Sequence, residues 1–203
     1  MYELYSVKPC KATDKACLKS SAQDAVPHIT LGDPTLGIPS SDPLIIDEIK
    51  SKQPNLNIEF TENVIRGASK AKILDVERDV EKPALKLTLS LPLHLTGKYI
   101  LLGNILFYQA SENMLFNIDV KYKTIEKNGN KYWKVTGFNY TYDLVEKVHI
   151  KFNNLFGGDE SKGNWKEIIE ELGGPIIESI VTSFFNCIKK WFLVTPTNKL
   201  ELP

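Results

Sequence analysis

The sequence lacks the residue groupings on which most enzymes and metal sites depend. Its three histidines, His28, His94 and His149, lie far apart and have no metal-like spacing. His-Glu-x-x-His, Cys-x-x-Cys, Gly-x-Ser-x-Gly and Gly-rich phosphate-loop motifs are all missing. The Ser-Ser-Asp run at 40–42 stands between prolines and is better explained by turn and cap chemistry than by a nucleophile. We therefore predict a protein that is not an enzyme and that holds no metal and no cofactor.

The chain also lacks net charge. Its 203 residues include 25 Lys and Arg against 25 Asp and Glu, without a basic run. Nucleic-acid binding requires positive charge opposite phosphates, so it has no support here. The length suits a sizeable core and no long linker divides it, so we expect a single ligand-binding domain over residues 1–203.

Membrane signals are missing as well. The first four residues, Met-Tyr-Glu-Leu, lack the apolar core of a signal peptide. The apolar run at 172–194 contains Gly-Gly-Pro, a glutamate and a Lys-Lys pair, so its uninterrupted part is too short for a transmembrane helix.

Cysteine is scarce, with three residues in the chain. Cys10 and Cys17 lie close together and predict a small disulfide loop that leads into a helix. Asn139 begins a glycosylation sequon and points away from the apolar face of its predicted strand. These features favour a mature, secreted, monomeric protein in which Met1 takes the place of a cleaved leader. We expect Cys187 to be a buried free thiol, with an intermolecular bridge as the alternative.

The strongest pattern lies near the carboxyl end. Between residues 165 and 194, apolar side chains recur at steps of three and four, and a second stripe runs beside the first. A helix that is apolar on more than one face must be wrapped by other parts of the chain. At 1.5 Å per residue it would be roughly 45 Å long, with a kink or a broken turn at Pro175. The first stripe consists of Trp165, Ile168, Ile169, Leu172, Ile176, Ile180, Phe184, Ile188 and Trp191, and the second of Ile177, Val181, Phe185 and Phe192.

Residues 54–153 alternate between apolar and polar side chains in several runs, which predicts an antiparallel sheet with one wet face. Asn128-Gly129 is a strong hairpin signal between two such runs. Pro92 cannot donate a ladder hydrogen bond and therefore marks an edge, a bulge or a break. Near the amino end, residues 14–26 predict a short helix that Pro27 ends, and residues 31–54 predict an ordered loop with apolar anchors.

Several segments in fixed order are together typical of one known family. They are Cys10-x6-Cys17 leading into Ser21-Ala22-Gln23-Asp24-Ala25-Val26-Pro27, then Leu36-Gly37-Ile38-Pro39-Ser40-Ser41-Asp42-Pro43-Leu44, Asn63-Val64-Ile65-Arg66-Gly67-Ala68-Ser69 and Asn164-Trp165-Lys166-Glu167. Over essentially the whole chain, this set resembles the takeout and juvenile-hormone-binding protein family of insects.

The resemblance implies an α+β fold in which a long helix is wrapped by a highly curved antiparallel β-sheet, related to lipid-binding folds of the TULIP type. It also implies an internal apolar tunnel for a lipid-like ligand. The juvenile-hormone-binding branch carries a second disulfide that ends on the long helix, whereas Cys187 has no fourth cysteine to pair with. This departure favours the takeout branch.

We predict that the chain is an extracellular carrier, in haemolymph or another extracellular fluid, of a long-chain lipid, quinone, fatty acid or terpenoid. A binding protein specific for juvenile hormone, a sesquiterpenoid ester, is the first alternative, and a module that docks on lipid surfaces or a receptor is the second. The predicted cavity lining lies on the helix and on the apolar face of the sheet. Its candidate residues are Ile176, Ile180, Phe184, Ile188, Leu87, Leu89, Phe116, Ile118, Tyr140 and Tyr142.

Overall fold

A computed structural model describes residues 7–50, 59–101, 104–145, 149–152 and 165–202. The interpretation of Met1, the strand positions at 54–58, and the side chains of Trp165, Ile168, Ile169 and Leu172 lie outside the described parts.

The long helix α2 spans Trp165–Val194, the range that the apolar period predicts. Helical structure continues through Pro175, so the alternative of a broken turn is wrong. One turn later, the Ser179 hydroxyl donates a hydrogen bond to the Pro175 carbonyl oxygen over 2.8 Å. The helix therefore tolerates the loss of the one backbone donor that a proline lacks.

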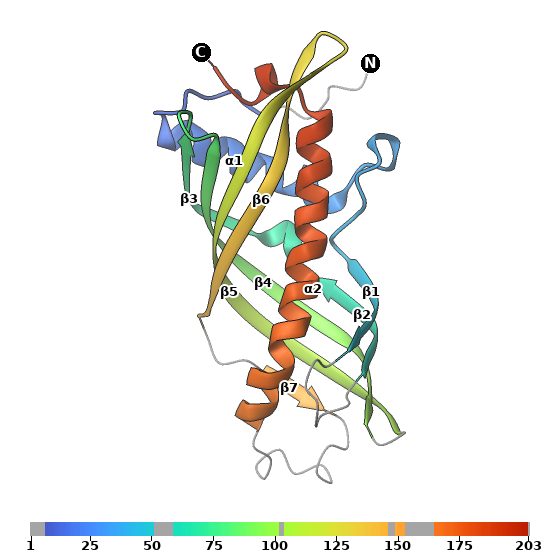
Figure 1. Ribbon diagram of the computed structural model, residues 1–203. Helices are drawn as coiled ribbons and strands as arrows, with labels where there is room; N and C mark the ends of the chain where they lie inside the picture. Colours follow the sequence, from blue (N-terminus) through green and yellow to red (C-terminus); the bar gives the residue numbers. More distant parts are fainter. Residues whose placement is uncertain (1–6, 51–58, 102–103, 146–148, 153–164, 203) are drawn as a thin grey trace.

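A single antiparallel sheet curls around α2, which confirms the predicted α+β fold (Figure 1). Its main order is β1-β2-β4-β5-β6, with β3 paired to β4 and β7 paired to β5. Both edge strands of that order, β1 and β6, pack against α2, so the sheet encloses the helix from two sides. The strands are β1 Leu44–Lys50, β2 Glu59–Arg66, β3 Lys72–Asp79, β4 Ala84–Leu101, β5 Asn104–Lys127, β6 Asn130–Leu144 and β7 His149–Phe152.

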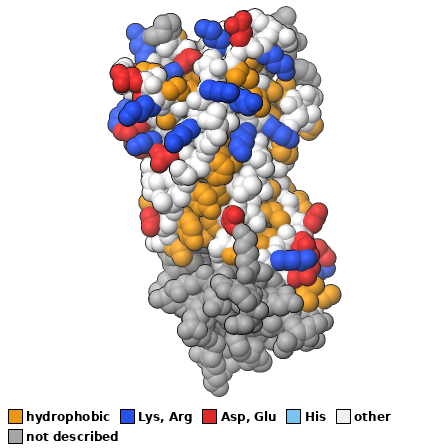
Figure 2. Space-filling model, in the orientation of Figure 1, with side chains coloured by type: hydrophobic (Ala, Val, Ile, Leu, Met, Phe, Trp, Pro, Cys, Tyr) orange, Lys and Arg blue, Asp and Glu red, His pale blue; other side chains and the backbone are white. Residues whose placement is uncertain are grey.

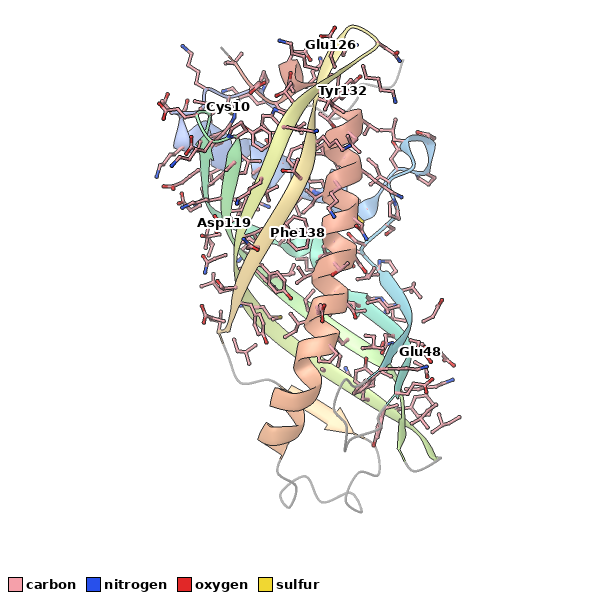
Figure 3. All side chains as sticks on the ribbon, viewed as in Figure 1. Cys10, Glu48, Asp119, Glu126, Tyr132 and Phe138 are labelled. Atoms are coloured by element: carbon pink, nitrogen blue, oxygen red, sulfur yellow. A yellow bond between two sulfur atoms is a disulfide. The ribbon has the colours of Figure 1, made fainter. Side chains whose placement is uncertain are left out.

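Aromatic packing fixes the β6 edge to the helix. Phe138 projects from β6 toward α2 (Figure 3), and its ring stacks on Phe185 with centroids 3.5 Å apart. The ammonium group of Lys189 lies 5.5 Å from the same ring. The ring pair excludes water along this contact, and the lysine covers its outer side.

Pro92 occupies a local edge inside β4. On one side β4 pairs with β5 along its whole length, and Pro92 faces Asn113 there. On its other side, β4 pairs with β3 up to Ser90, which lies opposite Lys72, and with β2 from His94 onward, which lies opposite Arg66. Pro92 therefore lies between the two partners, where the described pairings require no backbone N–H donor on that side of β4. Of the predicted alternatives of an edge, a bulge or a break, the structure has a local edge.

The hairpin between β5 and β6 turns at Asn128 and Gly129, as predicted. Both residues have positive φ, 52° and 74°, as a type I′ turn requires. By contrast, β1 lies in the segment predicted to be a loop. Asp47 and Glu48 interrupt the alternation between Ile46 and Ile49, which hides the strand from a period-two search.

Helix α1 spans Lys15–Leu31 and crosses the sheet at the end of the molecule that also holds the short segment at 197–202 (Figure 1). Its first turn is capped by Asp14, whose carboxylate accepts from the Cys17 amide over 3.0 Å. The prediction that Pro27 ends this helix is wrong, because the helix continues to Leu31. The Thr30 hydroxyl donates to the Val26 carbonyl oxygen over 2.8 Å, and Val26 and Thr30 are buried, so packing holds the last turn.

Cys10 and Cys17 form a disulfide with Cα atoms 5.7 Å apart. The bridge joins residues seven apart in sequence and ties the segment before α1 to its first turn. Replacing both cysteines by serine is expected to lower the free energy of unfolding by about 2–3 kcal/mol, because the unfolded chain gains the entropy of an open loop. Urea unfolding of the variant beside the oxidised and reduced parent protein measures this loss. Equal midpoints in all three samples would contradict it.

Candidate ligand-binding site

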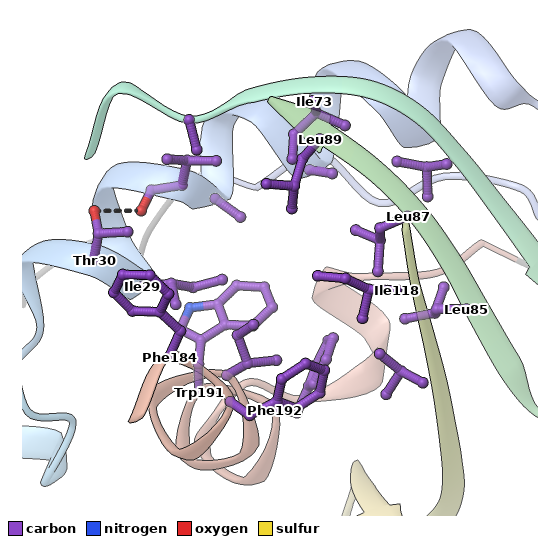
Figure 4. A pocket seen from close by; sticks show the side chains of 18 of the residues that line it. Ile29, Thr30, Ile73, Leu85, Leu87, Leu89, Ile118, Phe184, Trp191 and Phe192 are labelled. Carbon is purple, nitrogen blue, oxygen red and sulfur yellow. Dashed lines mark hydrogen bonds between the residues drawn. The ribbon is translucent and has the colours of Figure 1, made fainter. Parts of the chain in front are cut away.

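A cavity of about 200 Å³ lies between α1, α2 and the inner face of the sheet (Figure 4). Leu85, Leu87 and Leu89 reach it from β4, Ile118 from β5, and Phe184 and Trp191 from α2. Each strand contributes alternate residues, because one face of the pleat points inward.

The lining is almost wholly apolar. Only Ser21, Thr30 and Ser41 bring hydroxyl groups, and no charged side chain is among the described lining residues. The described lining residues are Val7, Leu18, Ser21, Ala22, Ala25, Val26, Ile29, Thr30, Ser41, Ala68, Ala71, Ile73, Val76, Leu85, Leu87, Leu89, Leu91, Phe116, Ile118, Val120, Trp133, Val181, Phe184, Phe185, Ile188, Trp191, Phe192 and Leu200.

The three hydroxyl groups are already engaged as donors. Ser21 donates to the Lys8 carbonyl oxygen over 2.7 Å, and Thr30 donates to that of Val26. Ser41 donates to the Thr30 carbonyl oxygen over 3.4 Å. These bonds satisfy the backbone around the cavity and leave the hydroxyl oxygens as acceptors only.

Six of the ten predicted site residues lie in this lining. They are Phe184, Ile188, Leu87, Leu89, Phe116 and Ile118. Ile176, Ile180, Tyr140 and Tyr142 lie outside it. Ile180 is 2% exposed and belongs to the packed core, while Tyr142 is 38% exposed. Ile176 and Tyr140 are half-buried at the margin of the core.

The predicted set extends farther toward the start of α2 than this lining does, and it includes no residue of α1. Leu18, Ala22, Ala25, Val26 and Ile29 present one face of α1 to the cavity. Their spacing gives a signal in the sequence, but nothing local indicates that this face covers a cavity rather than packed side chains. The second stripe of α2 was a further signal, since Val181, Phe185 and Phe192 all line the space.

Asp42 fixes one wall of the cavity. Its carboxylate accepts hydrogen bonds from the Gly67 amide over 3.1 Å and from the Ser69 amide over 2.8 Å, and from the Ser69 hydroxyl group. Two of the quoted sequence segments, 36–44 and 63–69, are thereby joined in space. Ser41 and Ala68, which neighbour these residues in the chain, both line the cavity. The bonds of Asp42 therefore fix the two backbone segments relative to each other.

The same bonds decide the charge state of Asp42. Burial alone would raise its pKa, but the hydrogen bonds from Ser69 and Gly67 and the nearby Lys70 together lower the pKa below the ordinary value of 3.8. In the unfolded chain these donors are lost, so on acidification the unfolded state takes up the proton first. The stabilisation by this carboxylate is therefore complete above pH 3.8 and is lost as the pH falls through the lower folded pKa.

Replacing Asp42 by Ala is expected to lower the free energy of unfolding at neutral pH by about 2–3 kcal/mol, because charge-assisted hydrogen bonds are lost and two backbone donors lose their acceptor. The variant should also lose part of the decrease in stability below pH 3.8. Urea unfolding across pH tests both effects. Asp119→Asn, on an exposed position of β5, is the matched control and should leave the neutral-pH midpoint unchanged. A midpoint for Asp42→Ala equal to that of the control would contradict the expectation.

Cys187 is the free cysteine among the described residues, and it is 2% exposed. Its thiol donates to the Pro39 carbonyl oxygen over 3.4 Å. Burial raises the pKa of the thiol and keeps it protonated at neutral pH. This is the buried hydrophobe that was predicted, and burial disfavours the alternative of an intermolecular bridge.

Outside the cavity, the exposed face in Figure 2 carries Lys and Arg interspersed with Asp and Glu over its upper part, and apolar side chains below them. Asn139 is exposed on β6, where a glycan could be attached, and its glycosylation stays a prediction.

Within the described residues, no group of His, Cys, Asp and Glu could hold a metal ion. None of the described helices combines the length and the apolar character that a membrane crossing needs.

Two solved structures are similar to this fold to different degrees. The crystal structure of takeout 1 from Epiphyas postvittana is 23% identical to this chain and has a TM-score of 0.85, with 97% of this chain and 100% of that chain covered. This likeness shows the shared fold. A lipopolysaccharide binding protein is 11% identical with a TM-score of 0.48, over 92% of this chain and 38% of the other. None of the curated proteins compared with the sequence matches it.

The family comparison extends over nearly the whole sequence. Residues 2–201 match the family described as "Haemolymph juvenile hormone binding protein (JHBP)". Membership implies that the chain is a binding protein for hydrophobic ligands rather than an enzyme. The chain belongs to the haemolymph juvenile hormone binding protein family.

Proposed function

We propose that the protein is an extracellular, monomeric carrier that holds an apolar small molecule in the cavity between α1, α2 and the sheet. The observation that carries this proposal is about 200 Å³ of space whose lining, within the described residues, contains no charged side chain. A ligand that removes about 300 Å² of apolar surface from water gains roughly 7 kcal/mol before the costs of association. The disulfide and the word haemolymph in the family description support secretion.

We assign the chain to the takeout branch. The second disulfide of the hormone-binding branch would end on the long helix, and Cys187 is buried there without a cysteine partner. A long-chain lipid, a quinone or a terpenoid fits an apolar lining that recognises length and width more than polar groups.

A second candidate is a binding protein specific for juvenile hormone. The family description favours it, because it names that hormone. Competition decides between the two candidates: a general carrier releases a bound sesquiterpenoid ester to an equimolar long-chain quinone, whereas a hormone-specific protein retains the ester. The remaining alternative, a module that docks on lipid surfaces or a receptor, has less support. A solid core would be expected for such a module, whereas this protein contains a cavity.

The decisive experiment for the carrier proposal is extraction of the purified protein with organic solvent, followed by mass spectrometry of what is released. We expect a stoichiometric apolar molecule that is missing from a Leu89→Trp preparation, in which the cavity is filled. Absence of any such molecule, together with failure of the protein to bind an apolar fluorescent probe, would refute the proposal.

A further inference from the structure

We propose that the indole N–H groups of Trp133 and Trp191 form a donor subsite for uncharged oxygen acceptors of the ligand. The subsite lies at the aromatic end of the cavity, where α2 finishes. This inference rests on the proposed carrier function and defines the chemical class of its ligand.

The two indoles are buried donors without acceptors. Trp133 is 4% exposed and Trp191 is 3% exposed, and both line the cavity. Among the residues that the structure describes, neither Nε1 atom has a hydrogen-bond partner. An indole can donate but cannot accept, and buried donors are rarely left unpaired in native proteins. The missing acceptors therefore belong to whatever occupies the space.

Packing holds both rings at the same end of the cavity. Phe192 contacts each of them, with ring centroids 5.4 Å from Trp133 and 5.2 Å from Trp191. Trp133 also stacks on Tyr122 at 4.5 Å, and the Arg78 guanidinium carbon lies 4.9 Å from its ring centre. Figure 4 shows the Trp191 ring beside Phe192 and Phe184 at the edge of the open space. Rings held in this way cannot turn to find another acceptor.

The surroundings select an uncharged acceptor. The hydroxyls of Ser21, Thr30 and Ser41 donate to backbone oxygens, and the described lining contains no cationic side chain. Arg78, behind Trp133, is already bonded to Glu201 and Tyr122. A carboxylate would lose its water without gaining a counter-charge, whereas a ketone, ester, quinone or ether oxygen needs only the indole donors.

The test compares ligands and variants in pairs. The affinities of methyl decanoate, dodecane and ionised decanoate are measured by displacement of an apolar fluorescent probe. The proteins compared are the wild type, Trp133→Phe and Trp191→Phe. We expect each variant to bind methyl decanoate roughly three- to tenfold more weakly and dodecane within about twofold of the wild type, since only the ester loses a hydrogen bond. Ionised decanoate should bind the wild type more weakly than its ester does.

Phe192→Leu is the matched control, because it changes an aromatic ring of the same cluster that carries no N–H. It should weaken ester and alkane binding by the same factor. Indole ¹H–¹⁵N spectra give a second measurement: methyl decanoate should shift the Trp133 and Trp191 signals and dodecane should not, with Trp165→Phe assigning the remaining indole signal.

The outcomes separate this inference from the carrier function. Equal weakening of ester and alkane binding in the Trp→Phe variants would overturn the donor subsite and leave the carrier function standing. Indole signals that do not move when the ester binds would do the same, because they would mean that bound water rather than the ligand accepts from the two N–H groups. A wild type that binds neither ester nor alkane overturns the carrier function, and the subsite with it.

Discussion

Replacing Leu89 by Trp is expected to lower the affinity for dodecane and methyl decanoate by more than tenfold, with a shift in melting temperature of only a few degrees. Leu89 lies on β4, is half-buried and projects into the cavity (Figure 4). An indole at this position fills space that the ligand would occupy. The ligand then loses about 2 kcal/mol of the binding free energy that it gains from apolar burial. Displacement of a fluorescent probe and thermal unfolding measure the two effects.

Stability and binding should separate in this variant because the new side chain enters existing space. In a well-packed core an added ring costs about 1–3 kcal/mol. Leu89 faces Phe116 in β5, and Phe116 faces Tyr142 in β6, so the three residues form one row across the sheet. Tyr142→Trp adds bulk in the same row but outside the lining, and it should leave both affinities unchanged.

This pair of variants can contradict the site in two ways. Unchanged affinity in Leu89→Trp would mean that the ligand binds elsewhere. Equal loss in both variants would mean that the cavity extends along the sheet to Tyr142, where the sequence had placed it.

The helix and the sheet could be predicted because their signals are local. The apolar steps of three and four fix α2 over Trp165–Val194, and positive φ at Asn128 and Gly129 follows from the residues themselves. Pro27 and β1 were misjudged where packing overrides the local signal. Burial of Val26 and Thr30 carries α1 past its proline, and pairing with β2 orders the strand around Asp47 and Glu48.

The position of the cavity could not be predicted, because packed and cavity-lining residues share the same pattern. Ile180 and Phe184 belong to the same stripe of α2, one turn apart. Ile180 is 2% exposed in the core, whereas Phe184 is half-buried and borders the cavity. The difference arises from α1, whose small residues Ala22 and Ala25 lie against the cavity and leave room that longer side chains would fill. Where α1 crosses the sheet is a property of the whole fold.

The segment at 200–202 pairs with Cys10 beside the cavity, and an ion pair anchors this segment to the sheet. The amide of Cys10 donates to the Leu200 carbonyl oxygen over 3.2 Å, and the amide of Leu202 donates to that of Cys10 over 2.9 Å. Between them, Glu201 pairs with Arg78 of β3, whose Nε also donates to the Tyr122 hydroxyl over 3.1 Å. Leu200 lines the cavity, so the position of this segment determines that part of the lining.

Replacing Glu201 by Gln is expected to lower the free energy of unfolding by about 2–3 kcal/mol, or the melting temperature by roughly 5–10 °C. The Arg78 side chain is 9% exposed, so loss of its partner leaves a guanidinium charge with little water to solvate it. The loss should fall below that of a fully buried pair because Glu201 is 25% exposed. Glu77→Gln is the matched control: Glu77 pairs with Lys15 at the surface, and its loss should barely move the transition. Equal melting temperatures for the two variants would show that Arg78 does not depend on Glu201 for its charge balance.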